Sequence, residues 1–197
     1  NSTKCADTLI HKDHLNVFQT KTVQQSKIMS VSRTEKNDLE ILWEKNSAFE
    51  FKMYRLFRKT SLGDFEEIHR TENRESKSFN LAFNSNLEGI QCFKIETIYH
   101  CVDSIDVNLL DTYCSIDLRA KADSNGIHLE WNTYQTASFE AYEIWREPIK
   151  GGKKQFVSRV DKSLTQATDS TTLCPQDYSY RIKAINIYGK GFQALRH

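Results

Sequence analysis

Apolar and polar residues alternate along many short stretches of this chain. The clearest are 127–132 and 178–184, in which every second residue is apolar. Side chains two positions apart lie on the same face of a strand, so this pattern predicts half-buried β-strands. No stretch of twelve or more residues keeps a helical period. The pattern therefore predicts an all-β chain.

The alternating stretches and the turn residues between them predict seven strands in each half. Asn125 and Gly126, for example, predict a tight turn because both residues tolerate positive φ. In the N-terminal half the expected strands are 26–34, 38–45, 49–57, 65–71, 76–83, 91–100 and 102–110. In the C-terminal half they are 114–122, 127–133, 140–147, 154–160, 164–170, 178–187 and 192–197. Seven short strands in about 90 residues are typical of a two-sheet sandwich.

The two halves also resemble each other in sequence. The stretch 39–43 (LEILW) matches 127–131 (IHLEW), 51–55 (FKMYR) is matched with 142–146 (YEIWR), and 92–97 (CFKIET) with 179–184 (SYRIKA). An offset of about 90 residues indicates a tandem repeat of whole domains, since solenoid repeats are shorter. We expect one domain at 23–112 and a second at 113–197. Residues 1–22 are interpreted as the end of a preceding repeat or as a linker.

Composition excludes several classes of function. The 197 residues are 39% hydrophobic and 27% charged, with a net charge of +1. This balance predicts no broad attraction to nucleic acid, and no apolar run is long enough to insert in a membrane. No nucleophile elbow, phosphate loop or zinc-protease motif occurs, so we expect a non-catalytic protein without cofactors. His11 and His14 near Cys5 fit no zinc pattern, so no metal site is expected.

Several motifs resemble those of fibronectin type III modules. They are the second-strand tryptophans Trp43 and Trp131, the Tyr-x-Ile-x-Arg pattern at 142–146, and the Tyr-x-Tyr-x-Ile-x-Ala pattern at 178–184. The second repeat resembles the fibronectin type III pattern along nearly its whole length. The first matches more loosely, and Gln91 stands where the family has a corner tyrosine. The resemblance implies two tandem seven-stranded immunoglobulin-like sandwiches, a fold that hosts many functions.

A narrower resemblance concerns the cysteines. The placing of Cys92, Cys101 and Cys114 is similar to that in fibronectin-like repeats of large secreted surface proteins of Bacteroidota. Those proteins are associated with gliding motility and type IX secretion. The resemblance implies an extracellular or cell-surface location and a place within a longer chain.

Alternation also divides the residues into core and surface. The expected core comprises Trp43, Trp131, Tyr142, Ile144, Tyr178, Tyr180 and Ile182. Trp145, Arg181 and Lys183 have the opposite parity and should point outward, with Tyr54 and Lys94 at the matching places of the first repeat. This face has two interpretations: a surface tryptophan packed under basic side chains, or a contact patch for a partner protein or a glycan.

One cysteine pair is in position for a disulfide. If strands 91–100 and 102–110 form a hairpin that turns near residue 103, Cys92 faces Cys114, because each lies eleven positions from the turn. Opposed residues in a strand pair are separated by about 5.5 Å, a distance that suits a disulfide. The alternative is two free thiols. Cys5, Cys101 and Cys174 have no predicted partner.

These observations predict a non-catalytic extracellular segment that acts as a spacer or adhesion stalk of a larger secreted surface protein. Its expected partners are the neighbouring domains of a longer chain, and a surface protein or glycan. Two alternatives stay open: a specific protein- or glycan-binding receptor fragment, and accessory domains of a secreted enzyme.

Overall fold

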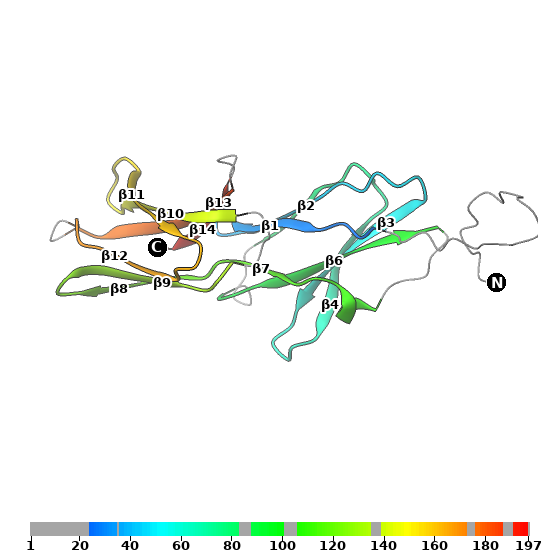
Figure 1. The fold of residues 1–197 in the computed structure, drawn as a ribbon, viewed down its shortest axis with the longest axis horizontal. Coiled ribbons are helices and arrows are strands. Elements are labelled where there is room, and N and C mark those ends of the chain that lie inside the picture. Colours follow the sequence, from blue (N-terminus) through cyan, green and yellow to red (C-terminus); the bar gives the residue numbers. More distant parts are fainter. Residues whose placement is uncertain are drawn as a thin grey trace, which may run out of the picture. The chain divides into compact units, whose positions relative to one another are not determined.

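The computed structural model describes residues 24–34, 36–82, 88–100, 106–134, 139–172, 176–186 and 191–196. Apart from the short 3-10 turn η2 (Val107–Leu109), the regular structure of these residues is β-strand (Figure 1). The expectation of an all-β chain is therefore confirmed for the described residues. The expectations for residues 1–22 and for Cys5, Cys101 and Cys174 lie outside them.

Except for the seventh strand of the first repeat, the strands follow the predicted ranges closely. In the first repeat they are β1 (Ile28–Arg33), β2 (Leu39–Trp43), β3 (Phe51–Lys59), β4 (Phe65–Thr71), β5 (Ser78–Leu81), β6 (Cys92–Tyr99) and β7 (Tyr113–Cys114). In the second they are β8 (Leu118–Asp123), β9 (Gly126–Trp131), β10 (Phe139–Pro148), β11 (Gln155–Asp161), β12 (Gln166–Asp169), β13 (Tyr178–Asn186) and β14 (Gly191–Arg196).

The strands form four sheets whose order repeats. The first repeat contains β1-β2-β5 and β4-β3-β6-β7, and the second contains β12-β9-β8 and β11-β10-β13-β14. Raising each strand number of the first repeat by seven gives the sheets of the second. The internal repeat seen in the sequence is thus also a repeat of strand order.

The chain divides into two compact units. Unit 1 holds the described residues of Asn1–Lys27, Trp43–Lys77 and Phe93–Asp111. Unit 2 holds those of Ile28–Leu42, Ser78–Cys92 and Thr112–His197. Unit 2 therefore contains the described part of the second repeat together with β1, β5, β7, the part of β2 up to Leu42, and the first residue of β6.

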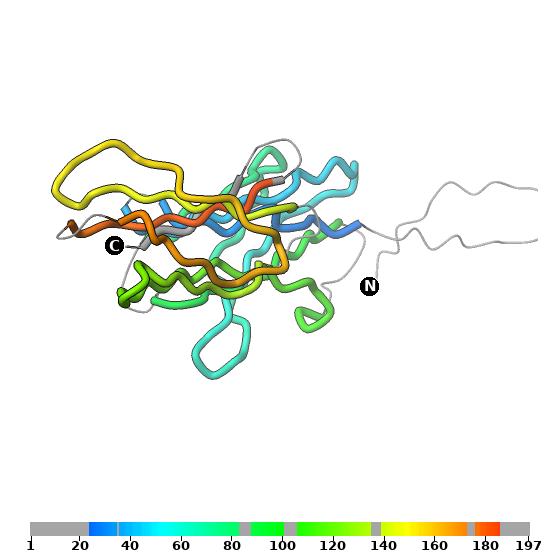
Figure 2. Tube along the Cα trace, turned by 60° about the vertical axis from the view of Figure 1, so that its left-hand side comes forward, coloured from blue at the N-terminus to red at the C-terminus, as the bar shows by residue number. Residues whose placement is uncertain are grey.

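In unit 2, the two sheets of the second repeat enclose a continuous apolar core. Strands β8 and β9 lie in one layer, and β10 and β13 lie in the other (Figure 1 and Figure 2). Trp131 meets Tyr142 edge-on with ring centroids 5.3 Å apart, and the Tyr142 hydroxyl accepts the backbone N–H of Tyr134 at 3.0 Å. The buried cluster comprises Ile116, Leu118, Leu129, Trp131, Tyr134, Phe139, Tyr142, Ile144, Tyr180, Ile182 and Ala184.

Unit 1 repeats this aromatic arrangement. Trp43 meets Tyr54 edge-on at 5.7 Å, and the Tyr54 hydroxyl accepts the backbone N–H of Asn46 at 2.7 Å. The expected core residues of both repeats are buried, except Tyr178, which is partly buried against the cluster of the second repeat. The two repeats therefore share an equivalent contact between a buried tryptophan and a hydrogen-bonded tyrosine.

The expected strand 102–110 is wrong in its described part. Residues 107–109 form η2 instead, and β7 is only two residues long. The turn begins at Asp106, whose carboxylate accepts the backbone N–H of Asn108 at 2.9 Å. The Lys94 ammonium group then donates to the carbonyl of Val107 at 2.9 Å, which holds the turn against β6.

A buried ion pair joins the two sheets of the second repeat. Asp169 ends β12, and its carboxylate accepts hydrogen bonds from Arg146 of β10 at 2.8 Å and from the hydroxyl of Tyr180 of β13 at 2.9 Å. Its other oxygen accepts from the backbone N–H and the hydroxyl of Thr171 at 3.0 Å and 2.7 Å. The Asp169 side chain is fully enclosed, and these bonds satisfy both of its oxygens.

Candidate functional site

The outer face of β10, β11 and β13 carries an aromatic and basic surface. The strand register places Trp145 opposite Arg181 on β13 and opposite Phe156 on β11, and Glu143 opposite Lys183. The grouping of Trp145, Arg181 and Lys183 on one face therefore follows from the observed register. We call these residues, with Glu143, Glu147, Lys154, Phe156 and Arg159, the Trp145 face.

Trp145 has neighbours on both sides. Its ring meets Phe156 edge-on with centroids 5.2 Å apart, and the Lys154 ammonium group lies 5.4 Å from the ring centre. The indole N–H donates to Glu143 at 3.3 Å. Phe156 stays 52% exposed. The sequence analysis missed Phe156 and Lys154, although the outward parity of β11 beside Trp145 was a signal that could have identified them.

Charge pairs flank the aromatic residues of the Trp145 face. Glu147 lies 3.6 Å from Arg181, and Glu143 stands between Lys183 and Arg159 in the register. The face contains four basic side chains, Lys154, Arg159, Arg181 and Lys183, and two acidic ones, Glu143 and Glu147. A cation–π contact at an exposed site is worth about 0.5–1 kcal/mol, so packing is one role of this arrangement. Packing alone does not explain why basic side chains outnumber acidic ones around the exposed ring of Phe156.

Tyr54 and Lys94 do not lie on an exposed face, which corrects the sequence expectation. Tyr54 is 1% exposed and packs on Trp43, and Lys94 is 5% exposed. The error for Tyr54 came from matching 51–55 with 142–146. The aromatic contacts and tyrosine hydrogen bonds instead match Tyr54 with Tyr142. Lys94 is correctly matched with Arg181 but is enclosed.

The true counterpart of Trp145 in the first repeat is Phe57. Phe57 stands opposite Lys94, as Trp145 stands opposite Arg181, and Arg55 stands opposite Glu96, as Glu143 stands opposite Lys183. The Arg55 guanidinium contacts Glu96 at 3.2 Å and Glu67 at 2.5 Å. Burial opposes the ionisation of Glu67, but hydrogen bonds from Arg55 and Arg70 lower the pKa of its carboxyl. The charges of Arg55, Arg70, Glu67 and Glu96 around Phe57 therefore pair with one another.

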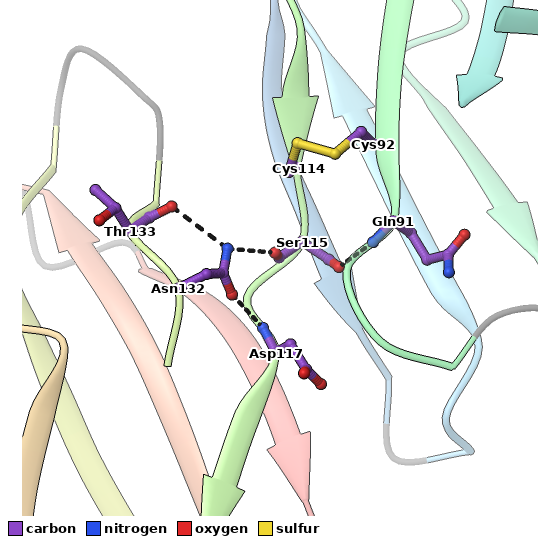
Figure 3. Close-up of a disulfide and its surroundings, with 7 residues drawn as sticks. All are labelled: Gln91, Cys92, Cys114, Ser115, Asp117, Asn132 and Thr133. Carbon is purple, nitrogen blue, oxygen red and sulfur yellow. Dashed lines mark hydrogen bonds between the residues drawn. A yellow bond between two sulfur atoms is a disulfide. The ribbon is translucent and has the colours of Figure 1, made fainter. Parts of the chain in front are cut away.

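A second candidate site is the connection between β7 and β8, where the predicted disulfide is confirmed. Cys92 and Cys114 are bonded, with Cα atoms 4.0 Å apart and a sequence separation of 22 (Figure 3). Next to the bridge, the Ser115 N–H donates to the Gln91 carbonyl at 2.8 Å, and the Gln91 N–H donates to the Ser115 hydroxyl at 3.0 Å. The register expected from the sequence is correct here, although residues 107–109 form a 3-10 turn and not a strand.

Asn132 fixes the other side of this connection. Its amide oxygen accepts the Asp117 N–H at 2.7 Å, and its amide nitrogen donates to the Ser115 carbonyl at 3.1 Å (Figure 3). Ile116, between these two residues, is 3% exposed and belongs to the core cluster. Each residue of 114–117 is thus bonded or buried within unit 2.

In the described ranges no three or more His, Cys, Asp or Glu side chains gather as a metal site. No helix in that part of the chain has the length and apolar character needed to cross a membrane.

Comparison with known proteins yields likeness to solved structures only. No protein-family model matches the sequence, and no curated protein matches it. The FN1–FN3 domains of chicken CNTN1 are 14% identical, with 89% of this chain and 67% of that chain covered and a TM-score of 0.36.

Two pectate lyases are also similar. PelI of Erwinia chrysanthemi is 15% identical over 40% of this chain, with a TM-score of 0.36, and Pel3 of Pectobacterium carotovorum is 18% identical over 42%, with a TM-score of 0.35. In both cases the match spans 26% of the lyase. At these TM-scores the likenesses carry no inference about function.

Proposed function

We propose that this chain is a non-catalytic pair of tandem fibronectin type III-like sandwiches, divided just after β7 (Tyr113–Cys114) and so within two residues of the expected boundary, that acts as a spacer in a longer extracellular protein. The strand order supports the fold. In each repeat the first, second and fifth strands form one sheet and the fourth, third, sixth and seventh form the other. This two-sheet antiparallel arrangement is typical of immunoglobulin-like sandwiches.

The observation that carries the spacer role is the connection at residues 114–117. A spacer transmits position only if its modules do not swing freely, and short bonded connections restrict such motion. Here the chain leaves the disulfide at Cys114 and is held by Asn132 at Ser115 and Asp117. Ile116 is locked in the core of the second repeat. Residues 114–117 are therefore all bonded or buried within unit 2.

The disulfide adds resistance under tension. Cys92 and Cys114 are 22 residues apart, so the bridge withholds the chain between them from extension. At about 3.4 Å per extended residue this is roughly 70 Å of chain that cannot be pulled out. Disulfides persist in oxidising compartments, which supports an extracellular or cell-surface location.

The expected partners are neighbouring domains of the parent chain, and a surface protein or glycan. Placement in a secreted surface protein of the Bacteroidota type is part of this proposal and rests on the sequence positions of Cys92, Cys101 and Cys114.

Pulsed dipolar spectroscopy tests the spacer role. Spin labels are introduced through non-canonical amino acids at the exposed positions Lys52 and Lys162, one in each repeat. The width of the distance distribution is compared with that of the pair Lys121 and Lys162, which lie within the second repeat. We expect similar widths, because residues 114–117 are bonded throughout. Asn132→Ala should broaden the distribution between repeats and leave the distribution within the second repeat unchanged.

Matched variants separate the contacts of Asn132. Asn132→Asp keeps the acceptor for the Asp117 N–H and loses the donor to the Ser115 carbonyl, so it should broaden the distribution less than Asn132→Ala. Gln166→Ala, an exposed change on β12, is the neutral control. The spacer role is rejected if the natural chain already shows a distribution as broad as that of Asn132→Ala.

A further inference from the structure

The turn that joins β8 to β9 (Figure 1) contains an exposed asparagine followed by a glycine. Asn125-Gly126 is the only Asn-Gly pair in the 197 residues. The backbone N–H of Asn125 donates to the Asp123 carboxylate at 2.7 Å. The side-chain amide of Asn125, however, has no hydrogen-bond partner among the residues that the structure describes. This side chain can therefore reorient at the tip of the hairpin.

The fold does not require asparagine at position 125. Asparagine is common in hairpin turns because it tolerates positive φ. Among the described non-glycine residues, however, only Asn37 has a positive φ. The bond from the backbone of residue 125 to Asp123 is open to any residue except proline, which lacks the N–H. The turn conformation therefore gives no reason for an asparagine side chain at this position.

Glycine is required at position 126, by contrast. Its φ is +136°, and an added Cβ would lie 2.2 Å from the Asp169 carbonyl oxygen and 2.9 Å from the carbonyl carbon. The backbone of the turn is thus packed directly against the end of β12. There the Asp169 carboxylate forms the buried ion pair with Arg146. A change in the backbone at Gly126 therefore disturbs the segment that carries this ion pair.

We propose that Asn125 is a site of spontaneous deamidation in the folded chain, with water as the co-reactant. The Gly126 backbone nitrogen loses its proton and attacks Cγ of Asn125. A C–N bond forms, the bond from Cγ to the side-chain nitrogen breaks, and ammonia leaves. Water then opens the resulting five-membered imide at either carbonyl, which gives aspartate or isoaspartate without any transfer of electrons. Glycine favours the attack because it has no side chain to hinder the approach.

The hairpin slows this reaction but does not prevent it. Gly126 is paired with Asp123, and this pair closes the turn formed by residues 124 and 125. The attack therefore requires the pair at the tip to open. Local openings at exposed ends of structure cost far less free energy than global unfolding, so the tip reaches the reactive state while the core of the repeat stays folded.

Isoaspartate weakens the second repeat through the backbone. In isoaspartate the chain runs through the side-chain methylene, which adds one backbone atom between positions 125 and 126. A two-residue turn closed by the pair of Asp123 and Gly126 then loses either this pairing or the seat of Gly126 against Asp169. The new carboxylate also adds a negative charge beside Asp123. We therefore expect the converted chain to unfold at lower urea concentration.

Mass mapping of the folded chain after incubation at neutral pH tests the proposal. Trypsin cleavage after Lys121 and Arg146 places Asn125 and Asn132 in one fragment. We expect progressive conversion of Asn125 to the acid, and no conversion of Asn132, whose amide group is hydrogen-bonded through both its oxygen and its nitrogen. Methylation by an isoaspartyl methyltransferase measures the isoaspartate fraction.

A variant and a peptide serve as controls. Asn125→Gln keeps an amide at this exposed position but would have to close a larger ring, so conversion should be lost. Its urea midpoint should equal that of the fresh natural chain and should not fall on incubation. A synthetic peptide of residues 122–129 lacks the hairpin and should convert faster than the folded chain. The converted chain, separated by anion exchange, should show the lowered midpoint.

Three results contradict this inference. One is an unmodified Asn125 in the folded chain after the peptide has been fully converted. Another is conversion of Asn132 as fast as that of Asn125, which would trace the reaction to global unfolding. The last is a converted chain with the midpoint of the fresh chain, which would overturn the coupling to Asp169. None of these bears on the spacer role, which the dipolar distances test separately.

Discussion

Replacing Asp169 by Ala should be among the most damaging single changes in the second repeat. The Asp169 carboxylate is fully enclosed and accepts from Arg146 at 2.8 Å and from Tyr180 at 2.9 Å. It is also the point where β12 of one sheet is bonded to β10 and β13 of the other. The Asp169→Ala variant leaves the Arg146 guanidinium, which is only 12% exposed, beside an uncharged gap.

The expected magnitude follows from the burial of the pair. Removing one partner of a buried ion pair costs about 3–5 kcal/mol, since the remaining charge is left unpaired. We expect about 3 kcal/mol, at the lower end, because Arg146 retains hydrogen bonds to Gln155 and Thr171. With a urea dependence of about 1–3 kcal/mol/M, this lowers the unfolding midpoint by about 1–3 M.

Urea unfolding followed by tryptophan fluorescence measures this loss. Asp161→Ala is the matched control, because the exposed Asp161 carboxylate accepts only local bonds from Ser163. Asp169→Asn keeps the shape and loses the charge, so its midpoint should fall between those of the natural chain and Asp169→Ala. The reasoning is refuted if Asp169→Ala lowers the midpoint no more than Asp161→Ala.

The pH dependence gives an independent check on Asp169. Burial opposes ionisation, but hydrogen bonds from neighbouring groups outweigh it and lower the pKa of this carboxyl. A lowered folded-state pKa stabilises the fold fully above the unfolded-state pKa of about 3.9, and this contribution is lost as pH falls toward the folded-state pKa. The difference in stability between the natural chain and Asp169→Ala should therefore be constant near neutral pH and shrink below about pH 4.

Two further changes test the fold. Trp131→Ala removes a core ring and should lower the free energy of unfolding in urea by about 3–5 kcal/mol. Trp145→Ala, on the outer face, should lower it by about 1 kcal/mol or less. Equal losses would contradict the assignment of core and surface. Gly126→Ala should cost about 1–3 kcal/mol, because φ at Gly126 is +136° and an added Cβ would lie 2.2 Å from the Asp169 carbonyl oxygen. The exposed neighbour change Asn125→Ala is its control, and a Gly126→Ala midpoint equal to that of Asn125→Ala would argue against the observed hairpin.

The disulfide shows how a correct prediction can come from a partly wrong premise. Cys92 and Cys114 pair as expected because the Ser115 N–H bonds to the Gln91 carbonyl and the Gln91 N–H bonds to the Ser115 hydroxyl, which sets the two cysteines opposite each other. The premise of a continuous strand at 102–110 failed, because Asp106 starts a 3-10 turn and Lys94 binds its carbonyl. Register depends only on residues near the bridge, so the intervening loop did not affect it.

The misplacement of Tyr54 shows the limit of matching patterns between repeats. Phe51 and Tyr142 are both aromatic starts of alternating stretches, so they appeared equivalent at an offset of 91. In the structure Tyr54 is instead equivalent to Tyr142. Each hydroxyl accepts a backbone N–H eight positions away in sequence, and each ring meets the tryptophan of its own repeat edge-on. Alternation of apolar and polar residues does not by itself show which residues of two repeats are equivalent. The contacts across the core are needed to decide it.

The sequence by itself determined the strands, their repetition and the inward-facing residues, because alternation and turn chemistry are local properties of the chain. Trp43, Trp131, Tyr142 and Ile144 could be assigned to the interior on this basis. Only the tertiary structure decided which polar groups are enclosed. Lys94, Glu96 and Asp169 are buried because segments distant in sequence cover them and satisfy their charges. The sequence pattern of a strand reports its two faces but not what lies over each, so the burial of Phe57 and Lys94 and the exposure of Phe156 became apparent only in three dimensions.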